Sequence, residues 1–216
     1  MSQELAVLVL TSASIGFLHV LAGPDHYLPF IAMARARRWS LARTAWITAL
    51  CGVGHIGSSV LLALLGIALG IATSKLEALE SFRGSLAAWG LISFGLLYFV
   101  WGMRAAYRRL SHQEEWEGGP PVASLAPWIL FTIFVFGPCE PLIPLLLYPA
   151  VKGSLFRMAL VTGIFGSATI LTMLGIVLPS TLGLAFLPMA RLERYRDALA
   201  GATICMCGLA VQFLGL

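Results

Sequence analysis

Long apolar segments separated by short polar stretches dominate the chain. We predict six membrane spans, over residues 5–34, 44–72, 84–103, 124–150, 155–178 and 197–216. Each reaches the ~20 residues that a helix needs to cross a hydrocarbon core of ~30 Å. The first and fourth segments are too long for one straight crossing, and each contains a Gly-Pro pair, at 23–24 and 137–138. The pattern therefore predicts an all-α membrane protein whose first and fourth spans are broken into half-helices.

The two broken segments belong to an internal repeat. Gly23-Pro24-Asp25-His26 and Gly137-Pro138-Cys139-Glu140 lie 114 positions apart, and 12 of 41 positions are identical between residues 16–56 and 130–170. Roughly four identities are expected by chance in a chain so rich in Leu, Ala and Gly. Three spans per repeat place the second repeat upside down relative to the first. We therefore predict a 3+3 inverted repeat of residues 1–103 and 124–216, joined by a polar cytoplasmic linker at 104–123.

Composition and charge restrict the location of the protein. The chain is 59% hydrophobic and 11% charged, which is typical of an integral membrane protein. Its net charge of +4 does not indicate a nucleic-acid partner, because ten of the 14 Lys and Arg residues lie in the three loops that share one side. The positive-inside rule places those loops in the cytoplasm and both termini outside it, as in a multi-pass inner-membrane protein. We expect the charged segment 73–83 on the other side to form a short interfacial helix.

Six side chains inside the spans are candidates for chemistry. Ionisable groups at membrane depth cost free energy, so they mark functional sites by default. A single histidine inside a membrane span is a hydrogen-bonded packing residue about as often as it is a functional one. An adjacent Asp-His pair at a helix break is hard to explain by packing. Imidazole with carboxylate suits first-row divalent metals such as Ni, Co, Zn or Fe. The predicted metal-site residues are His19, Asp25, His26, His55, Cys139 and Glu140.

Part of this set also carries a family resemblance. The segment from His19 to His26, which reads His-Val-Leu-Ala-Gly-Pro-Asp-His, is followed by Gly54-His55. This order resembles the signature of the nickel/cobalt transporter superfamily, closest to its NicO and urease-accessory UreH-like branch within the LysE-type superfamily. The resemblance implies that His19, Asp25, His26 and His55 form the metal site. Cys139 and Glu140 come from the internal repeat instead.

The sequence therefore predicts a transporter, not an enzyme, that moves a divalent transition-metal cation by alternating access. The metal is the substrate, and no permanent cofactor is expected. The expected partners are the lipid bilayer and the metal ion, with a second copy of the chain or a metal chaperone as further candidates.

Two alternatives remain open at this point. One is a transmembrane thiol electron carrier of the CcdA type that uses Cys139, although the repeat places Asp25, not a second cysteine, opposite it. The other is an exporter of an anion or small solute, with Arg43 and Arg157 as a symmetric charge pair.

Overall fold

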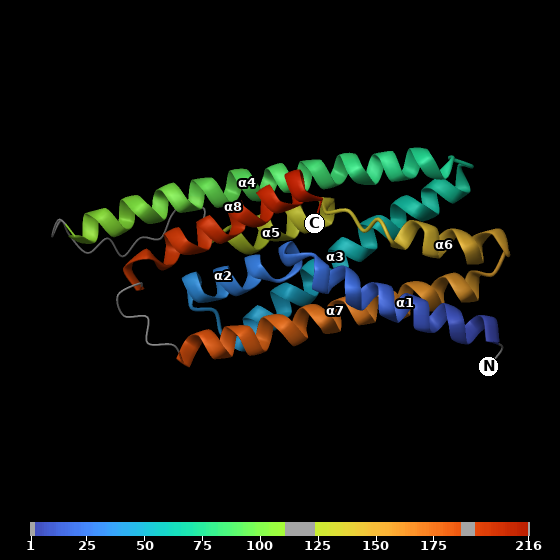
Figure 1. Ribbon diagram of the computed structural model, residues 1–216, viewed down its shortest axis with the longest axis horizontal. Coiled ribbons are helices and arrows are strands. Elements are labelled where there is room, and N and C mark those ends of the chain that lie inside the picture. Colours follow the sequence, from blue (N-terminus) through green and yellow to red (C-terminus); the bar gives the residue numbers. More distant parts are fainter. Residues whose placement is uncertain (1–2, 111–123, 187–192, 216) are drawn as a thin grey trace.

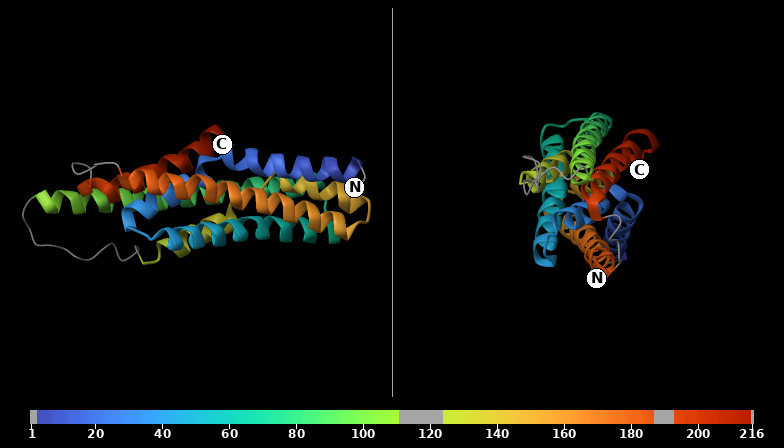
Figure 2. Two further views of the ribbon diagram at one scale, coloured as in Figure 1. Left: turned by 90° about the horizontal axis from the view of Figure 1, so that it is seen from below. Right: turned by 90° about the vertical axis from the view of Figure 1, so that its left-hand side faces the viewer.

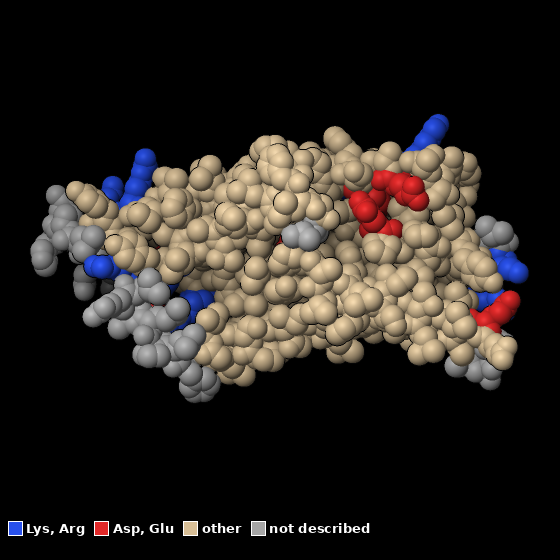
Figure 3. Space-filling model, in the orientation of Figure 1, with Lys and Arg blue, Asp and Glu red and all other residues tan. Residues whose placement is uncertain are grey.

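The computed structural model describes residues 3–110, 124–186 and 193–215, which form helices and no strands. The helices run roughly along the long axis of an elongated bundle (Figure 1), and two further views show the same single bundle (Figure 2). On the face drawn in Figure 3, Lys and Arg gather at the two ends, and the broad belt between them carries few charges apart from one acidic patch. The arrangement is that of a multi-pass membrane protein.

Within the described residues, five helices are long and apolar enough to cross a membrane, and shorter elements connect them. The long helices are α1 (Gln3–Ala22), α3 (Leu41–Ala68), α4 (Thr73–Leu110), α7 (Leu155–Phe186) and α8 (Arg196–Leu214). The shorter elements are the 3₁₀ turn η1 (Pro24–His26), α2 (Leu28–Arg37), α5 (Ala126–Phe136), α6 (Leu142–Val151) and the 3₁₀ turn η2 (Glu193–Tyr195). The all-α prediction is confirmed for the described residues.

The first predicted break lies at the expected place. Helix α1 ends at Ala22, and Gly23 adopts an extended conformation with φ −95° and ψ 94°. Pro24 then begins the η1 turn, because it has no N–H to donate to the preceding turn and its ring clashes with that turn. Helix α2 follows, so that α1 and α2 lie end to end along the bundle (Figure 1).

The second break has the same cause. Helix α5 ends at Phe136, and Gly137 leaves the helical conformation with φ −58° and ψ 139°, one residue before Pro138. Helix α6 starts at Leu142. With 11 and 10 residues, α5 and α6 are each too short to span a bilayer alone. They also follow one another along the long axis of the bundle (Figure 1).

Helix α4 differs from the sequence-based expectation. Residues 73–83, expected as a separate interfacial helix, form the beginning of one continuous helix of 38 residues. Leu76 fits directly over Gly66 of α3, where an added Cβ would come within 2.5 Å of the leucine side chain, and Glu80 is completely buried. Tertiary packing therefore draws this charged segment into the bundle. Helix α4 also extends beyond residue 103 into the predicted linker, whose residues 111–123 lie outside the described part of the chain.

Helices α4 and α8 pack with their backbones in direct contact. An added Cβ at Gly95 would lie 2.3 Å from the backbone nitrogen of Cys205, and one at Gly201 would lie 2.2 Å from that of Phe99. The same holds at Gly102, where the Cβ would lie 2.3 Å from the nitrogen of Ala198. Small residues at these positions allow the close approach that drives helix association in lipid.

The crossing of α3 and α7 forms the centre of the bundle. Gly52 of α3 packs against Ile170 of α7, and Gly166 of α7 packs against Ile56 of α3. Helix α1 packs along α7, while α5 packs along α3. His55 lies in the buried middle of α3, next to this crossing. The packing thus brings the two helix breaks to the same central region as His55.

We expect Gly201→Ala to destabilise the protein. The new methyl group meets the α4 backbone, so we expect the free energy of unfolding to fall by about 1–3 kcal/mol, as for other overpacked sites. The measurement is the thermal unfolding midpoint of the purified protein in detergent. Gly175→Ala on α7 is the control, because an added Cβ there meets nothing within 4 Å. The control should unfold at the same or a higher temperature, and an unchanged midpoint for Gly201→Ala would contradict the prediction.

Candidate metal centre

Three imidazoles meet at the first helix break. His19 comes from the last turn of α1, His26 from η1 and His55 from the middle of α3. One ligand nitrogen of each lies within 4.8 Å of those of the other two. Two nitrogens bound to one ion at about 2.1 Å each are at most about 4.2 Å apart, so small side-chain shifts are enough to bring all three onto one ion. His26 and His55 are buried, and His19 is half-buried.

The local backbone orients the His26 ring. Its Nδ1 lies 3.1 Å from Asp25 Oδ1 and 3.2 Å from the Gly23 carbonyl oxygen. Both neighbours are acceptors, so Nδ1 carries the hydrogen and donates it. The Nε2 atom is then the lone-pair nitrogen, and it is buried without a hydrogen-bond partner. A carboxylate on one side of the ring and a free nitrogen on the other is the usual arrangement of metal-binding histidines.

His55 is oriented in the same way by the second break. Its Nδ1 lies 3.3 Å from the carbonyl oxygen of Phe134 in the last turn of α5. Because a carbonyl can only accept, Nδ1 is the donor and Nε2 the free nitrogen, which is again buried and unpartnered. An unpaired buried nitrogen costs free energy unless something binds it. The structure contains two such nitrogens in one cluster.

The glycines of both breaks make room for these rings. A Cβ at Gly23 would lie 2.6 Å from His26 Nδ1 and 2.9 Å from Asp25 Oδ1. A Cβ at Gly137 would lie 3.1 Å from His55 Nδ1. The repeated Gly-Pro pair therefore does two things: proline ends the helix, and glycine lets an imidazole approach the backbone.

Cys139 and Glu140 point to different places. Cys139 is fully buried, and its Sγ lies 3.9 Å from His19 Nε2, at the edge of the histidine cluster. Glu140 is exposed and lines a neighbouring cavity instead. The structure thus brings three of the six predicted site residues together, His19, His26 and His55. Asp25 is bonded to His26, Cys139 lies beside His19, and Glu140 lies on the wall of the cavity.

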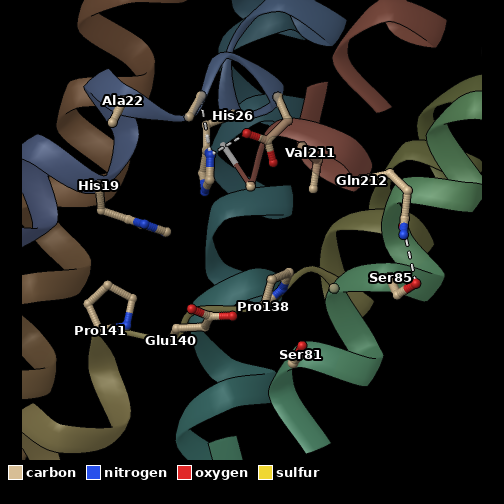
Figure 4. A pocket seen from close by; sticks show the side chains of 14 residues that line it. His19, Ala22, His26, Ser81, Ser85, Pro138, Glu140, Pro141, Val211 and Gln212 are labelled. Carbon is tan, nitrogen blue, oxygen red and sulfur yellow. Dashed lines mark hydrogen bonds and ion pairs between the residues drawn. The ribbon is translucent and has the colours of Figure 1, made fainter. Parts of the chain in front are cut away.

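The cavity has a volume of about 450 Å³ and reaches His19 and His26 from one side. Figure 4 shows His19, His26 and Glu140 around it, with side chains from α4 and α8 on the opposite wall. On that wall, Ser85 of α4 donates a hydrogen bond of 3.1 Å to Gln212 of α8. Oxygen atoms from Asp25, Glu140, Ser81 and Gln212 therefore border a space that leads to the imidazoles.

A buried ion pair on α4, beside the second break, was not predicted from the sequence. Arg83 Nη1 lies 2.6 Å from Oε1 of Glu80, and the exposed fractions of the two side chains are 13% and 0%. The guanidinium also donates to the carbonyl oxygen of Val135 and to Ser58 Oγ, both at 2.7 Å. The sequence does show a Glu and an Arg three positions apart beside an apolar segment, which is compatible with a buried ion pair. The same pattern also fits an interfacial helix.

The arginine pair of the solute-export alternative does not form one site. Arg43 lies in the first turn of α3, over the ring of Trp39 at 5.6 Å. Arg157 lies in the first turn of α7 and pairs with Glu4 at 3.2 Å. The two helices begin at opposite ends of the bundle (Figure 1), so these cations cannot bind one solute together.

Comparison with known proteins adds no name to this site: no family model, no curated protein and no solved structure matches the chain. The geometry of its own residues therefore carries the functional argument.

We expect Arg83→Met to be strongly destabilising. It leaves the Glu80 carboxylate buried without its cation, which typically costs about 3–5 kcal/mol. Replacing both members in Glu80→Leu/Arg83→Met removes the two charges together and should cost clearly less. Denaturant or thermal unfolding in detergent measures the difference. If the double variant were no more stable than Arg83→Met alone, the charge pair would not be the reason for the loss.

Proposed function

We propose that this protein carries a divalent transition-metal cation, of the Ni, Co, Zn or Fe class, across the membrane. The observation that carries the proposal is the histidine cluster at the first break, in which two buried Nε2 atoms have no partner. In each ring the other nitrogen, Nδ1, donates a hydrogen bond, and that bond fixes the tautomer. Such nitrogens are costly in an apolar bundle, and a bound cation repays the cost.

The donor set selects the class of cation. Imidazole nitrogen, with a nearby thiol, favours borderline and soft metals, whereas Mg²⁺ and Ca²⁺ prefer oxygen ligands. The oxygen-lined cavity beside the cluster suits an earlier stage of transport, in which the cation still keeps its water shell. Asp25 and Glu140 supply the negative charge that attracts it there. The cation then exchanges water for imidazole as it moves inward.

Six spans in two inverted halves supply the mechanism of this proposal. The two half-helices α5 and α6 have about the length of one membrane crossing between them, at ~1.5 Å per residue. Corresponding contacts also support the repeat. Helices α3 and α7 begin at Leu41 and Leu155, each after a serine whose Oγ accepts from the backbone N–H three residues on, at 3.2 and 3.3 Å.

The contacts at the centre of the bundle follow the same register. Gly52 and Gly166 are equivalent in the repeat, and so are Ile56 and Ile170, because the members of each pair lie 114 positions apart. Gly52 contacts Ile170, and Gly166 makes the equivalent contact with Ile56. A two-fold relation of this kind lets two halves exchange conformations around a central site, as alternating access requires. In this proposal the end of the bundle rich in arginine faces the cytoplasm and the membrane is the cell's inner membrane.

We expect His26→Ala to weaken metal binding by at least tenfold. Removing a group that only orients a ligand costs 10–100-fold in affinity, so losing a ligand should cost no less. Calorimetric titration of Ni²⁺ or Co²⁺ into the purified protein measures binding, and uptake into proteoliposomes measures transport. His112→Ala is the matched control, because His112 is the one remaining histidine. Normal metal uptake by His26→Ala would refute the proposed function.

Gly23→Ala should weaken metal binding without removing any ligand. The added methyl group would lie 2.6 Å from His26 Nδ1, so the ring must turn away from the cluster. We expect at least a tenfold loss of affinity, by the same reasoning as for a residue that orients a ligand. Gly57→Ala on α3 is the control, since its Cβ meets nothing within 4 Å. Equal affinities for the two variants would contradict the role assigned to Gly23.

A further inference from the structure

We propose that Glu80, held by Arg83, positions Cys139 as the fourth ligand of the metal site. The inference rests on the metal-binding function proposed above and adds a residue of another helix to it. Glu80 is a positioning residue in this proposal, since it acts through Cys139 and not on the metal itself. A charge pair buried inside an apolar bundle is expensive and calls for a functional reason.

The ion pair holds the second helix break from both sides. Arg83 donates to the carbonyl oxygen of Val135, before the break, at 2.7 Å. Glu80 Oε2 accepts a hydrogen bond of 3.2 Å from the backbone N–H of Cys139, after the break. Helix α4 also touches the break directly, because a Cβ on Gly84 would lie 2.7 Å from the ring of Pro138. The conformation of Gly137-Pro138-Cys139 is therefore set by α4.

Both oxygens of the Glu80 carboxylate are occupied. Oε1 binds Arg83 at 2.6 Å, and Oε2 binds the N–H of Cys139. The pair of Glu80 with Arg83 has no net charge, so it attracts a cation less than an unpaired carboxylate would. What remains for Glu80 is to fix the backbone of Cys139.

Fixing this backbone places the sulfur. Cys139 Sγ lies 3.9 Å from His19 Nε2. Metal–nitrogen and metal–sulfur bonds of about 2.1 and 2.3 Å add to more than this separation, so one ion can bond to both atoms. The ligand atoms that lie within 4.8 Å of one another come from the three histidines, so the sulfur of Cys139 has to move toward His26 and His55 to join them. Three histidines and one cysteine would then form a four-ligand set, which suits Zn²⁺ and Co²⁺ better than the histidines alone.

The test uses Co²⁺ as the probe on the purified full-length protein in detergent. A bound thiolate gives Co²⁺ a sulfur-to-cobalt charge-transfer band, which we expect in the wild type and not in Cys139→Ser. Glu80→Asp keeps the charge opposite Arg83 but withdraws the carboxylate by one methylene. We expect it to lose most of this band and to bind Co²⁺ 10–100-fold more weakly. Glu77→Asp, an exposed position on the same helix, should leave band and affinity unchanged.

A double-mutant cycle separates positioning from a general structural role. If Glu80 acts through Cys139, Glu80→Asp should cause no further loss of affinity in a Cys139→Ser background. Additive losses, or a full sulfur band in Glu80→Asp, would overturn the proposal. Should Glu80→Asp not fold, Glu80→Leu/Arg83→Met removes both charges and should show the same loss of the band. A wild type that binds Co²⁺ without a sulfur band refutes this inference alone, whereas one that binds no Co²⁺, Ni²⁺ or Zn²⁺ refutes the proposed function.

Discussion

The structure depends on how two helix breaks inside an apolar bundle satisfy their backbone. Where a membrane helix is interrupted, freed N–H and C=O groups find no water and each costs several kcal/mol if left unpaired, by the general rule of about 2–7 kcal/mol. Here side chains add to the backbone hydrogen bonds of the breaks. The carbonyl of Gly23 accepts from the N–H and from Nδ1 of His26, and that of Phe134 accepts from the N–H of Gly137 and from Nδ1 of His55. The ion pair on α4 binds backbone groups on both sides of the second break.

The same hydrogen bonds orient the candidate ligands. A histidine that donates from Nδ1 to a backbone carbonyl must present Nε2 to the space beyond, and two histidines here do so. In the proposed function, these bonds to the helix breaks therefore also prepare the histidines to bind a cation. The glycines contribute as well, since Gly23 and Gly137 leave space for an imidazole beside the backbone. Rigid helices hold the whole arrangement, as a preorganised site requires.

The two breaks share a backbone solution but differ in chemistry. The first supplies imidazole and carboxylate from its own residues, Asp25 and His26. The second supplies a thiol and backbone carbonyls, and it takes its charged partners from α4. The two breaks therefore have similar backbones but place different side chains beside the histidine cluster. In the proposed function, this asymmetry suits a cation that arrives through the oxygen-lined cavity and then binds to nitrogen.

The sequence by itself determined the features that depend on local chemistry: the apolar spans, the two breaks, and the three histidines and Asp25 near the first of them. Proline and glycine act on their immediate neighbours, and hydrophobicity acts residue by residue, so these signals survive without a fold. Tertiary structure decided which member of Cys139-Glu140 faces the histidines and whether Glu80 and Arg83 lie in lipid headgroups or in the core. Those outcomes depend on contacts between distant segments, such as Leu76 over Gly66 and Glu80 on the N–H of Cys139, which no local pattern encodes.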